Sequence, residues 1–141
     1  MRVTESCVIS CAAADVYSSL SKFDFSFWSL VESSAIVREG NGIGISVVLT
    51  FKDKTVQTFR AVGMDDFRRS VTLELVDSTA TTVLSLIHCI SVYPVTKSDT
   101  PTCFVEWETD FSFDAGQDVL QDSRYKKLEA FADMQRVFGK K

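Results

Sequence analysis

The C-terminal part of the chain has the hydrophobic pattern of one long amphipathic helix, Gly116 to Phe138. At roughly 100° per residue, its apolar side chains gather on one face. Such a face needs a partner surface, so we expect the helix to close over a sheet formed by the preceding residues. Lys127 falls near the centre of this face, which indicates that the space between helix and sheet is not wholly dry core. The apolar residues of the face are Leu120, Phe131, Met134 and Phe138, flanked by Val119, Leu128, Ala130 and Val137.

Before this helix, the alternation of apolar and polar residues predicts strands. The first strand, Arg2–Cys11, is exposed on one side, and two short helices follow it, Ala12–Leu20 and Phe23–Leu30. Short turn-forming segments join the later strands, and short connections favour antiparallel neighbours because parallel strands need long crossovers. We therefore predict an antiparallel meander of the strands Ser33–Glu39, Ile43–Phe51, Thr55–Val62, Phe67–Val76, Thr82–Tyr93 and Thr102–Phe113.

The last two predicted strands indicate which side chains point inward, because each has one set of alternate residues that is more apolar. On the final strand this set contains Trp107 and Thr109, and on the preceding strand it contains Leu86 and His88, the only histidine. A one-residue error or a bulge would reverse this assignment. The opposite set of the final strand is acidic and is expected to face water: Glu106, Glu108 and Asp110.

Composition and charge narrow the class of protein. The 141 residues suit one domain, 1–141, and 45% hydrophobic residues with only two prolines are typical of a globular protein. The net charge of −4 comes without a cluster of basic residues, so nucleic acid is not expected as a partner. The N-terminus lacks a continuous apolar segment and no stretch is long enough for a membrane span, so we expect a cytoplasmic protein. We further expect a monomer or weak dimer.

The four cysteines show no CxxC spacing and fall in or at the ends of predicted strands. We expect them to be reduced, buried and apolar in character. With a single histidine, the chain has too few soft ligands for a zinc site. We therefore predict no metal and no cofactor. The cysteines are Cys7, Cys11, Cys89 and Cys103.

The predicted order of elements, together with four groups of residues, resembles the START-like, birch-pollen-allergen-like (SRPBCC) superfamily, and within it the polyketide cyclase/dehydrase and lipid-transport group. The resemblance covers nearly the whole chain. The matching groups are Val16-Tyr17 with Phe23 and Trp28, the glycine-rich turn Glu39-Gly40-Asn41-Gly42-Ile43-Gly44, the hairpin Met64-Asp65-Asp66, and Val105-Glu106-Trp107 with Phe111.

The resemblance implies an α+β helix-grip fold. In it, a seven-stranded antiparallel curved sheet grips the long C-terminal helix around an elongated apolar cavity, and two short helices follow the first strand. It further implies that this cavity binds sterols, lipids, hormones or polyketides, and that some members catalyse cyclisation, dehydration or condensation there. Two departures concern chemistry. Enzymatic plant relatives tend to carry an acid in the segment matching Val56–Arg60, which has none here, and Lys127 stands where the last helix often has a small residue.

Three polar residues are candidates for chemistry, and each also has a structural interpretation. His88 suits a general base or a donor to a ligand carbonyl, or it is a hydrogen-bonded core histidine. Lys127 suits a counter-charge for an acidic ligand, or its stem lies on apolar surface while its head reaches water. Arg60 grips an anion in the cavity if Val56, Thr58 and Arg60 face inward, or it is a surface charge if Phe59 does.

The remaining candidate residues would either line the walls of a cavity or pack in the hydrophobic core without contacting a ligand. Together with the three polar candidates they make up the predicted ligand-binding set: Trp28, Arg60, Leu86, His88, Trp107, Thr109, Lys127, Phe131 and Met134.

The leading functional hypothesis is binding of a hydrophobic small molecule, such as a lipid, sterol or polyketide-like compound, for transport or sensing. The first alternative is a cyclase/dehydratase-type enzyme. In it, His88 is the candidate catalytic residue, and His88 with Lys127 or Arg60 would supply the acid-base and oxyanion-stabilising groups. The second alternative is a protein-interaction module similar to co-chaperone domains of this fold.

Overall fold

The computed structural model describes residues 1–38, 44–79, 85–112 and 115–139. The predicted glycine-rich turn Glu39–Gly44, except for Gly44, and the start of the predicted strand Thr82–Tyr93 lie outside these residues. The elements, in chain order, are β1 (Arg2–Ile9), α1 (Ala13–Ser21), β2 (Val31–Arg38), β3 (Ile45–Phe51), β4 (Val56–Asp65), β5 (Ser70–Ser78), β6 (Leu86–Pro94), β7 (Cys103–Phe111) and α2 (Gln117–Phe138).

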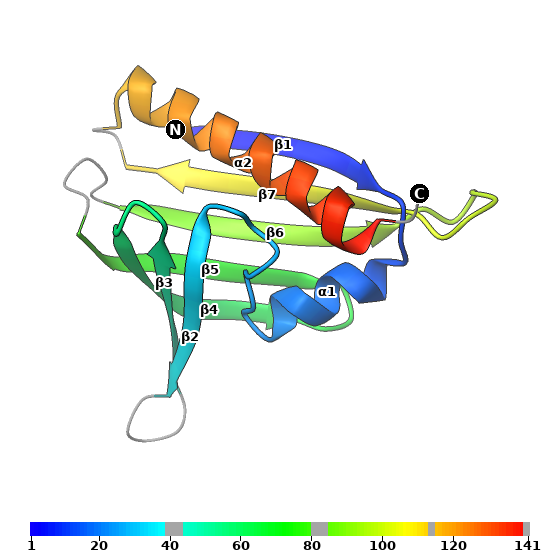
Figure 1. Ribbon diagram of the computed structural model, residues 1–141, viewed down its shortest axis with the longest axis horizontal. Coiled ribbons are helices and arrows are strands. Elements are labelled where there is room, and N and C mark those ends of the chain that lie inside the picture. The colour runs from blue at the N-terminus through cyan, green and yellow to red at the C-terminus, as the bar shows by residue number, and fades with distance from the viewer. Residues whose placement is uncertain (39–43, 80–84, 113–114, 140–141) are drawn as a thin grey trace.

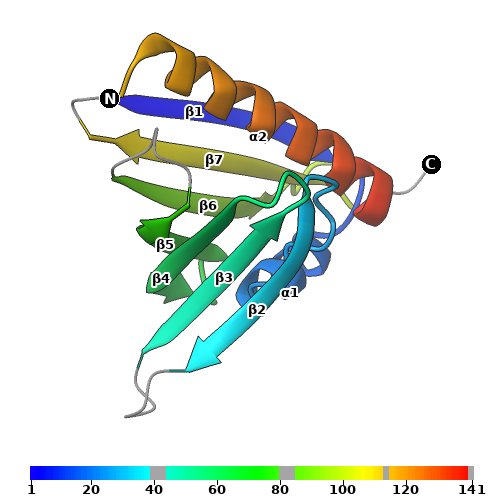
Figure 2. The same cartoon turned by 60° about the vertical axis from the view of Figure 1, so that its left-hand side comes forward.

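The strands form one antiparallel sheet of seven in the order β1-β7-β6-β5-β4-β3-β2. The sheet curves strongly, so that β2 and β3 run steeply across the direction of β6 and β7 (Figure 1). Helix α2 runs beside β1 on the concave side of this curve, as the turned view shows (Figure 2). Helix α1 packs against β5 and β6. The predicted fold class, an antiparallel curved sheet around a long C-terminal helix, is confirmed.

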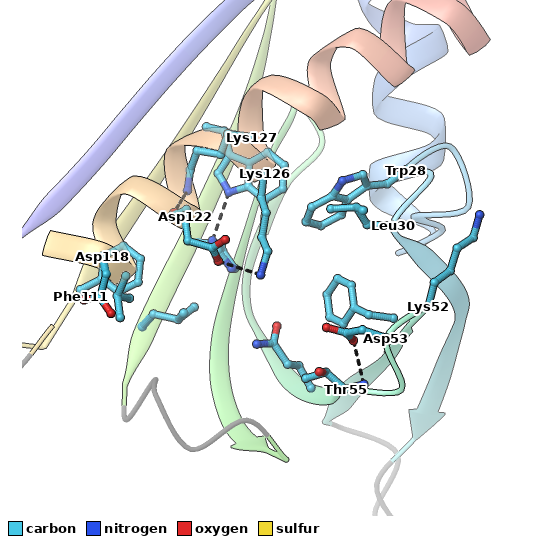
Figure 3. A pocket seen from close by; sticks show the side chains of 17 residues that line it. Trp28, Leu30, Lys52, Asp53, Thr55, Phe111, Asp118, Asp122, Lys126 and Lys127 are labelled. Carbon is cyan, nitrogen blue, oxygen red and sulfur yellow. Dashed lines mark hydrogen bonds and ion pairs between the residues drawn. The ribbon is translucent and has the colours of Figure 1, made fainter. Parts of the chain in front are cut away.

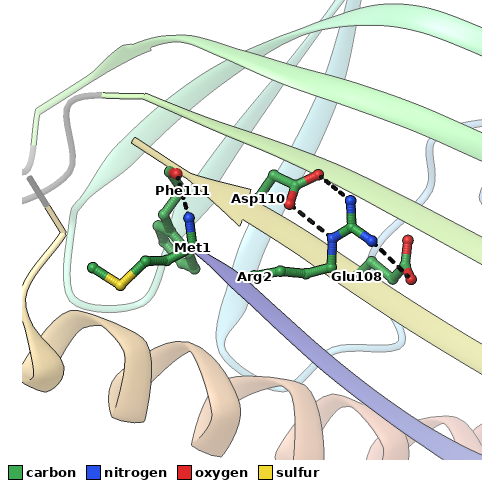
Figure 4. Close-up of polar contacts among 5 residues, drawn as sticks. All are labelled: Met1, Arg2, Glu108, Asp110 and Phe111. Carbon is green, nitrogen blue, oxygen red and sulfur yellow. Dashed lines mark hydrogen bonds and ion pairs between the residues drawn. The ribbon is translucent and has the colours of Figure 1, made fainter. Parts of the chain in front are cut away.

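Alternation along β7 separates core from solvent as the sequence predicted. Trp107 is 3% exposed and Thr109 fully buried, whereas Glu106 and Glu108 on the other face are partly exposed. This outer face carries the ion pair of Arg2 with Asp110, with 2.9 Å between Arg2 Nε and Asp110 Oδ1 (Figure 4). The apolar inner face of β7 therefore turns toward α2.

The inner faces of the sheet and α2 share one core. Within α2, Lys127, Ala130, Phe131 and Met134 are buried, while Leu128 on the flank is 41% exposed. The apolar face of the helix is therefore narrower than the sequence indicated, but its centre is where the 3.6-residue period predicted it.

The second predicted short helix, Phe23–Leu30, is wrong. The segment is a series of tight turns, in which Trp28 N donates to Phe25 O at 3.0 Å and Ser26 N donates to the Asp24 carboxylate at 3.0 Å. The three phenylalanines recur every second position and Trp28 follows the last of them, a spacing that a helix would spread over much of its circumference. Turns bury the whole aromatic set instead: Phe23, Phe25, Phe27 and Trp28.

The orientation of residues along β4 shows whether Arg60 faces the cavity or the surface. Phe59 is 2% exposed and packs inward, whereas Arg60 is exposed on the outer face. The pairing of β4 with β5 shifts register between Thr58 and Phe59 and again between Ala61 and Gly63. The expectation that Arg60 points into a cavity is therefore wrong, because the strand places its odd-numbered residues toward the core.

All four cysteines lack disulfides. Cys11 and Cys103 are buried, and Cys7 and Cys89 are half-buried, so burial is less complete than predicted. Cys11 also lies just after β1 rather than inside a strand. No helix of the described residues is both long and apolar enough to cross a membrane.

Candidate functional site

A pocket of about 460 Å³ lies between the sheet and the first half of α2 (Figure 3). Its aromatic walls come from the turns before β2 and from β3 and β7, its floor includes β6 residues, and α2 supplies the opposite side. The lining residues are Trp28, Leu30, Phe51, Lys52, Asp53, Thr55, Gln57, Leu86, His88, Trp107, Phe111, Asp118, Val119, Asp122, Ser123, Lys126 and Lys127.

Lys127 brings a buried amine to this pocket. Its side chain is only 2% exposed, its Nζ donates to Ser123 Oγ at 2.6 Å, and the same Nζ lies 5.2 Å from the centroid of the Trp107 ring. Burial lowers the pKa of Lys127 to about 8, an effect that the charge of Glu5 partly opposes. Among the described residues no carboxylate lies within 4.0 Å of this amine, and Glu5 is itself paired with Arg124, with 3.1 Å between Oε1 and Nε.

His88 is held by two hydrogen bonds to the same ring nitrogen. Trp107 Nε1 donates to His88 Nδ1 at 3.1 Å, and Thr109 Oγ1 lies 2.7 Å from that nitrogen. Because an indole N–H can only donate, we assign Nδ1 as the unprotonated acceptor, whose one lone pair Trp107 and the Thr109 hydroxyl share, and we place the proton of the neutral ring on Nε2. Burial, and secondly the charge of Lys127, lower the pKa of His88 to about 3. His88 is therefore a neutral imidazole at pH 7.

Aromatic rings form the apolar part of the site. Trp107 makes edge contacts with Trp28 at 5.5 Å and with Phe131 at 6.4 Å between ring centroids, and Trp28 makes a further edge contact with Phe51 at 5.7 Å. Trp28 Nε1 is buried and has no hydrogen-bond partner among the residues that the structure describes. An unpaired buried donor is costly in a folded protein, and this one belongs to a residue that lines the pocket.

Charged residues surround the pocket mouth, and sequence reasoning missed them. Lys126 Nζ lies 2.8 Å from Asp122 Oδ2 on α2. Across the mouth, Asp53 accepts from Thr55 N at 2.9 Å in the β3–β4 turn, which contributes most to lowering the Asp53 pKa. The signal was present in the spacing of four between Asp118, Asp122 and Lys126, which places them on one side of the helix.

The pocket brings together five of the predicted site residues: Trp28, Leu86, His88, Trp107 and Lys127. Thr109 lies behind His88 and holds its ring. Phe131 and Met134 are buried in the core and do not line the pocket, and Arg60 lies on the outer face of the sheet.

The arrangement is suited to binding more than to acid–base chemistry. General base catalysis requires a nitrogen free to take a proton, usually oriented by an acid. Here Nδ1 of His88 is occupied by the donors of Trp107 and Thr109. No group of three or more His, Cys, Asp or Glu side chains is placed to hold a metal ion in the described part of the chain.

Neither a protein-family model nor a curated protein sequence matches this chain. Solved structures do. The protein XoxI from Bacillus cereus is 20% identical, with a TM-score of 0.80 over 97% of this chain and 94% of its own. Ginseng major latex-like protein 151 from Panax ginseng is 15% identical, with a TM-score of 0.74 over 98% and 97%. Truncated norcoclaurine synthase from Thalictrum flavum is 14% identical, with a TM-score of 0.65 over 99% and 95%.

At these identities the comparisons establish the fold. The chain shares the helix-grip fold of these structures, which is the fold that the resemblance read from the sequence implied. One of these similar structures is a synthase by name, so the fold by itself does not separate binding from catalysis.

Proposed function

We propose that this protein binds one apolar small molecule, of the lipid, sterol or polyketide-like type, in the pocket between the sheet and α2. The observation that carries the proposal is the pocket itself, a cavity of about 460 Å³ with aromatic walls and a few polar groups directed at it. Ligand sites of small molecules have this size and this combination of apolar lining with sparse polar contacts.

The state of His88 favours binding over the enzymatic alternative. A cyclase or dehydratase would need His88 to take up a proton near neutral pH, but its Nδ1 accepts from Trp107 and its pKa is lowered to about 3. Arg60, the other partner considered for catalysis, lies on the outer face of the sheet. Lys127 remains in the pocket, where a buried amine serves recognition of a ligand as well as it serves chemistry.

The experiment is a titration with Nile red, a neutral dye whose emission rises in apolar surroundings. We expect saturable binding of one dye per chain at micromolar concentration. Val119→Trp places a bulky side chain at a half-buried position that lines the pocket, so it should weaken binding. Leu128→Trp is the matched control, because Leu128 lies on the exposed flank of the same helix and does not line the pocket.

Absence of saturable binding would refute the proposal. Equal dye affinity in Val119→Trp, Leu128→Trp and the native protein would also refute it, because the dye would then bind elsewhere.

A further inference from the structure

We propose that the ligand is an amphipathic monocarboxylic acid whose carboxylate lies between Lys127 and His88 and whose apolar part lies against the aromatic wall. This inference rests on the proposed function, because it names the class of molecule that the same pocket takes.

The first argument is the unmet need of the Lys127 amine for a negative partner. An ammonium has three donors, and the contacts of this one are the hydroxyl of Ser123 and the face of Trp107. Glu5, the acid whose charge acts on this amine, is engaged by Arg124. A charge that is buried without a counter-charge is expensive, so an anion entering the pocket would be stabilised there.

The second argument is a neighbouring donor at His88. With Nδ1 occupied by Trp107 and Thr109, the ring carries its proton on Nε2. No hydrogen bond of the described residues uses Nε2, and His88 lines the pocket. Trp107 contacts both His88, with 5.5 Å between ring centroids, and the Lys127 amine. The Lys127 amine and the His88 ring therefore both lie beside the Trp107 indole. A carboxylate bound there could accept from Lys127 with one oxygen and from His88 Nε2 with the other.

The charges around the mouth indicate a single negative charge on the ligand. Lys126 is already neutralised by Asp122, and the Lys52 side chain points away from the pocket (Figure 3), so Asp53 and Asp118 are the acids left at this opening. A ligand with two or more negative charges would be repelled by these acids, whereas one carboxylate matches the one buried amine. The ligand's apolar part would contact the lining residues Trp28, Leu30, Phe51 and Leu86.

The test is competition at pH 7 between protein-bound Nile red and two ligands of equal chain length, decanoate and 1-decanol. Without a specific site for the anion, the alcohol should bind better, since an ionised carboxylate is costly to move into an apolar cavity. With the site, decanoate should displace the dye at roughly tenfold lower concentration than 1-decanol, as expected for charge-assisted hydrogen bonds.

Two variants locate the effect. Lys127→Met keeps the apolar stem and removes the charge, so it should abolish the preference for decanoate while leaving 1-decanol affinity nearly unchanged. Arg136→Met is the matched control, since it removes a positive charge from an exposed position of the same helix that does not line the pocket, and it should keep the preference.

The outcomes separate this inference from the proposed function. Dye binding with equal or better displacement by 1-decanol in the native protein would overturn the carboxylate assignment while leaving the pocket as a binding site. The comparison of decanoate with 1-decanol uses the native protein alone, so it does not depend on the folding of a variant. A decanoate preference that survives in Lys127→Met would also overturn it. Absence of any dye binding would overturn both proposals.

Discussion

Trp107 is the residue on which the site and the core most depend, so its replacement gives the sharpest stability prediction. Its side chain is 3% exposed, and its ring contacts those of Trp28, His88 and Phe131. Truncation of a large buried aromatic side chain costs about 3–5 kcal/mol, from lost burial and from the cavity left behind. Trp107→Ala should therefore lower the free energy of unfolding by roughly this amount.

A second substitution divides this loss into its parts. Trp107→Phe keeps a ring in place but removes the N–H that donates to His88 Nδ1. One hydrogen bond is worth about 0.5–1.5 kcal/mol net, and the smaller ring leaves some empty volume, so we expect a loss of about 1–3 kcal/mol. The order native, Trp107→Phe, Trp107→Ala should therefore hold.

The assay is equilibrium denaturation in urea at pH 7, followed by circular dichroism so that tryptophan fluorescence is not needed. Comparable m-values among the three proteins would show that the unfolded states are alike. A loss below about 1 kcal/mol for Trp107→Ala would refute the reasoning, because it would mean that Trp107 is not in the core and that the register of β7 is wrong.

Three further predictions follow from the pKa values and thiol burial. The Lys127 pKa of about 8 lies below its ordinary 10.5, so between these pH values the unfolded chain holds a proton that the folded one lacks. The native protein should therefore gain up to about 3 kcal/mol relative to Lys127→Met as pH rises through this window, and a difference independent of pH would contradict this. The His88 pKa of about 3 lies below 6.5, so its contribution to stability should fall as pH drops from 6.5 toward 3, and its imidazole NMR signals should not titrate between pH 8 and 5. A midpoint near 6.5 would contradict the burial of this ring beside the Lys127 charge. At least three of the four cysteines should resist a thiol reagent in the native state, because Cys11 and Cys103 are buried and burial raises the pKa of Cys7 to about 12. Rapid reaction of two or more would contradict the burial of these thiols.

The parts of the fold that the sequence predicted are those with a long, regular period. Helix α2 repeats its apolar face over several turns, so both its existence and the inward position of Lys127 could be read from spacing alone. Strand β7 alternates cleanly, which placed Trp107 in the core. In both elements local pattern and tertiary packing require the same arrangement, so the pattern was sufficient.

Other features depended on contacts that no local pattern encodes. The Phe23–Leu30 segment is rich enough in aromatics to suggest a helix, but Asp24 and the backbone close turns there. Strand β4 alternates weakly, so the side of Arg60 was open until pairing with β5 fixed it.

The state of His88 depends on Trp107 and Thr109, which are 19 and 21 residues away in sequence. The pocket mouth joins the β3–β4 turn to α2, which are far apart in the chain. Sequence patterns therefore predicted individual inward-facing residues, whereas the site as a whole follows from the curvature of the sheet.

The most direct test of the account uses the chain's two tryptophans, both of which line the pocket. In ¹⁵N-labelled protein each gives one indole N–H signal in a ¹H–¹⁵N NMR spectrum, so the two signals report on the site without a dye or an attached probe. On titration with decanoate we predict that both signals move and reach a plateau at one ligand per chain, and that Lys127→Met requires more decanoate to reach it. If neither signal moves while the protein stays folded, the pocket does not bind this class of ligand.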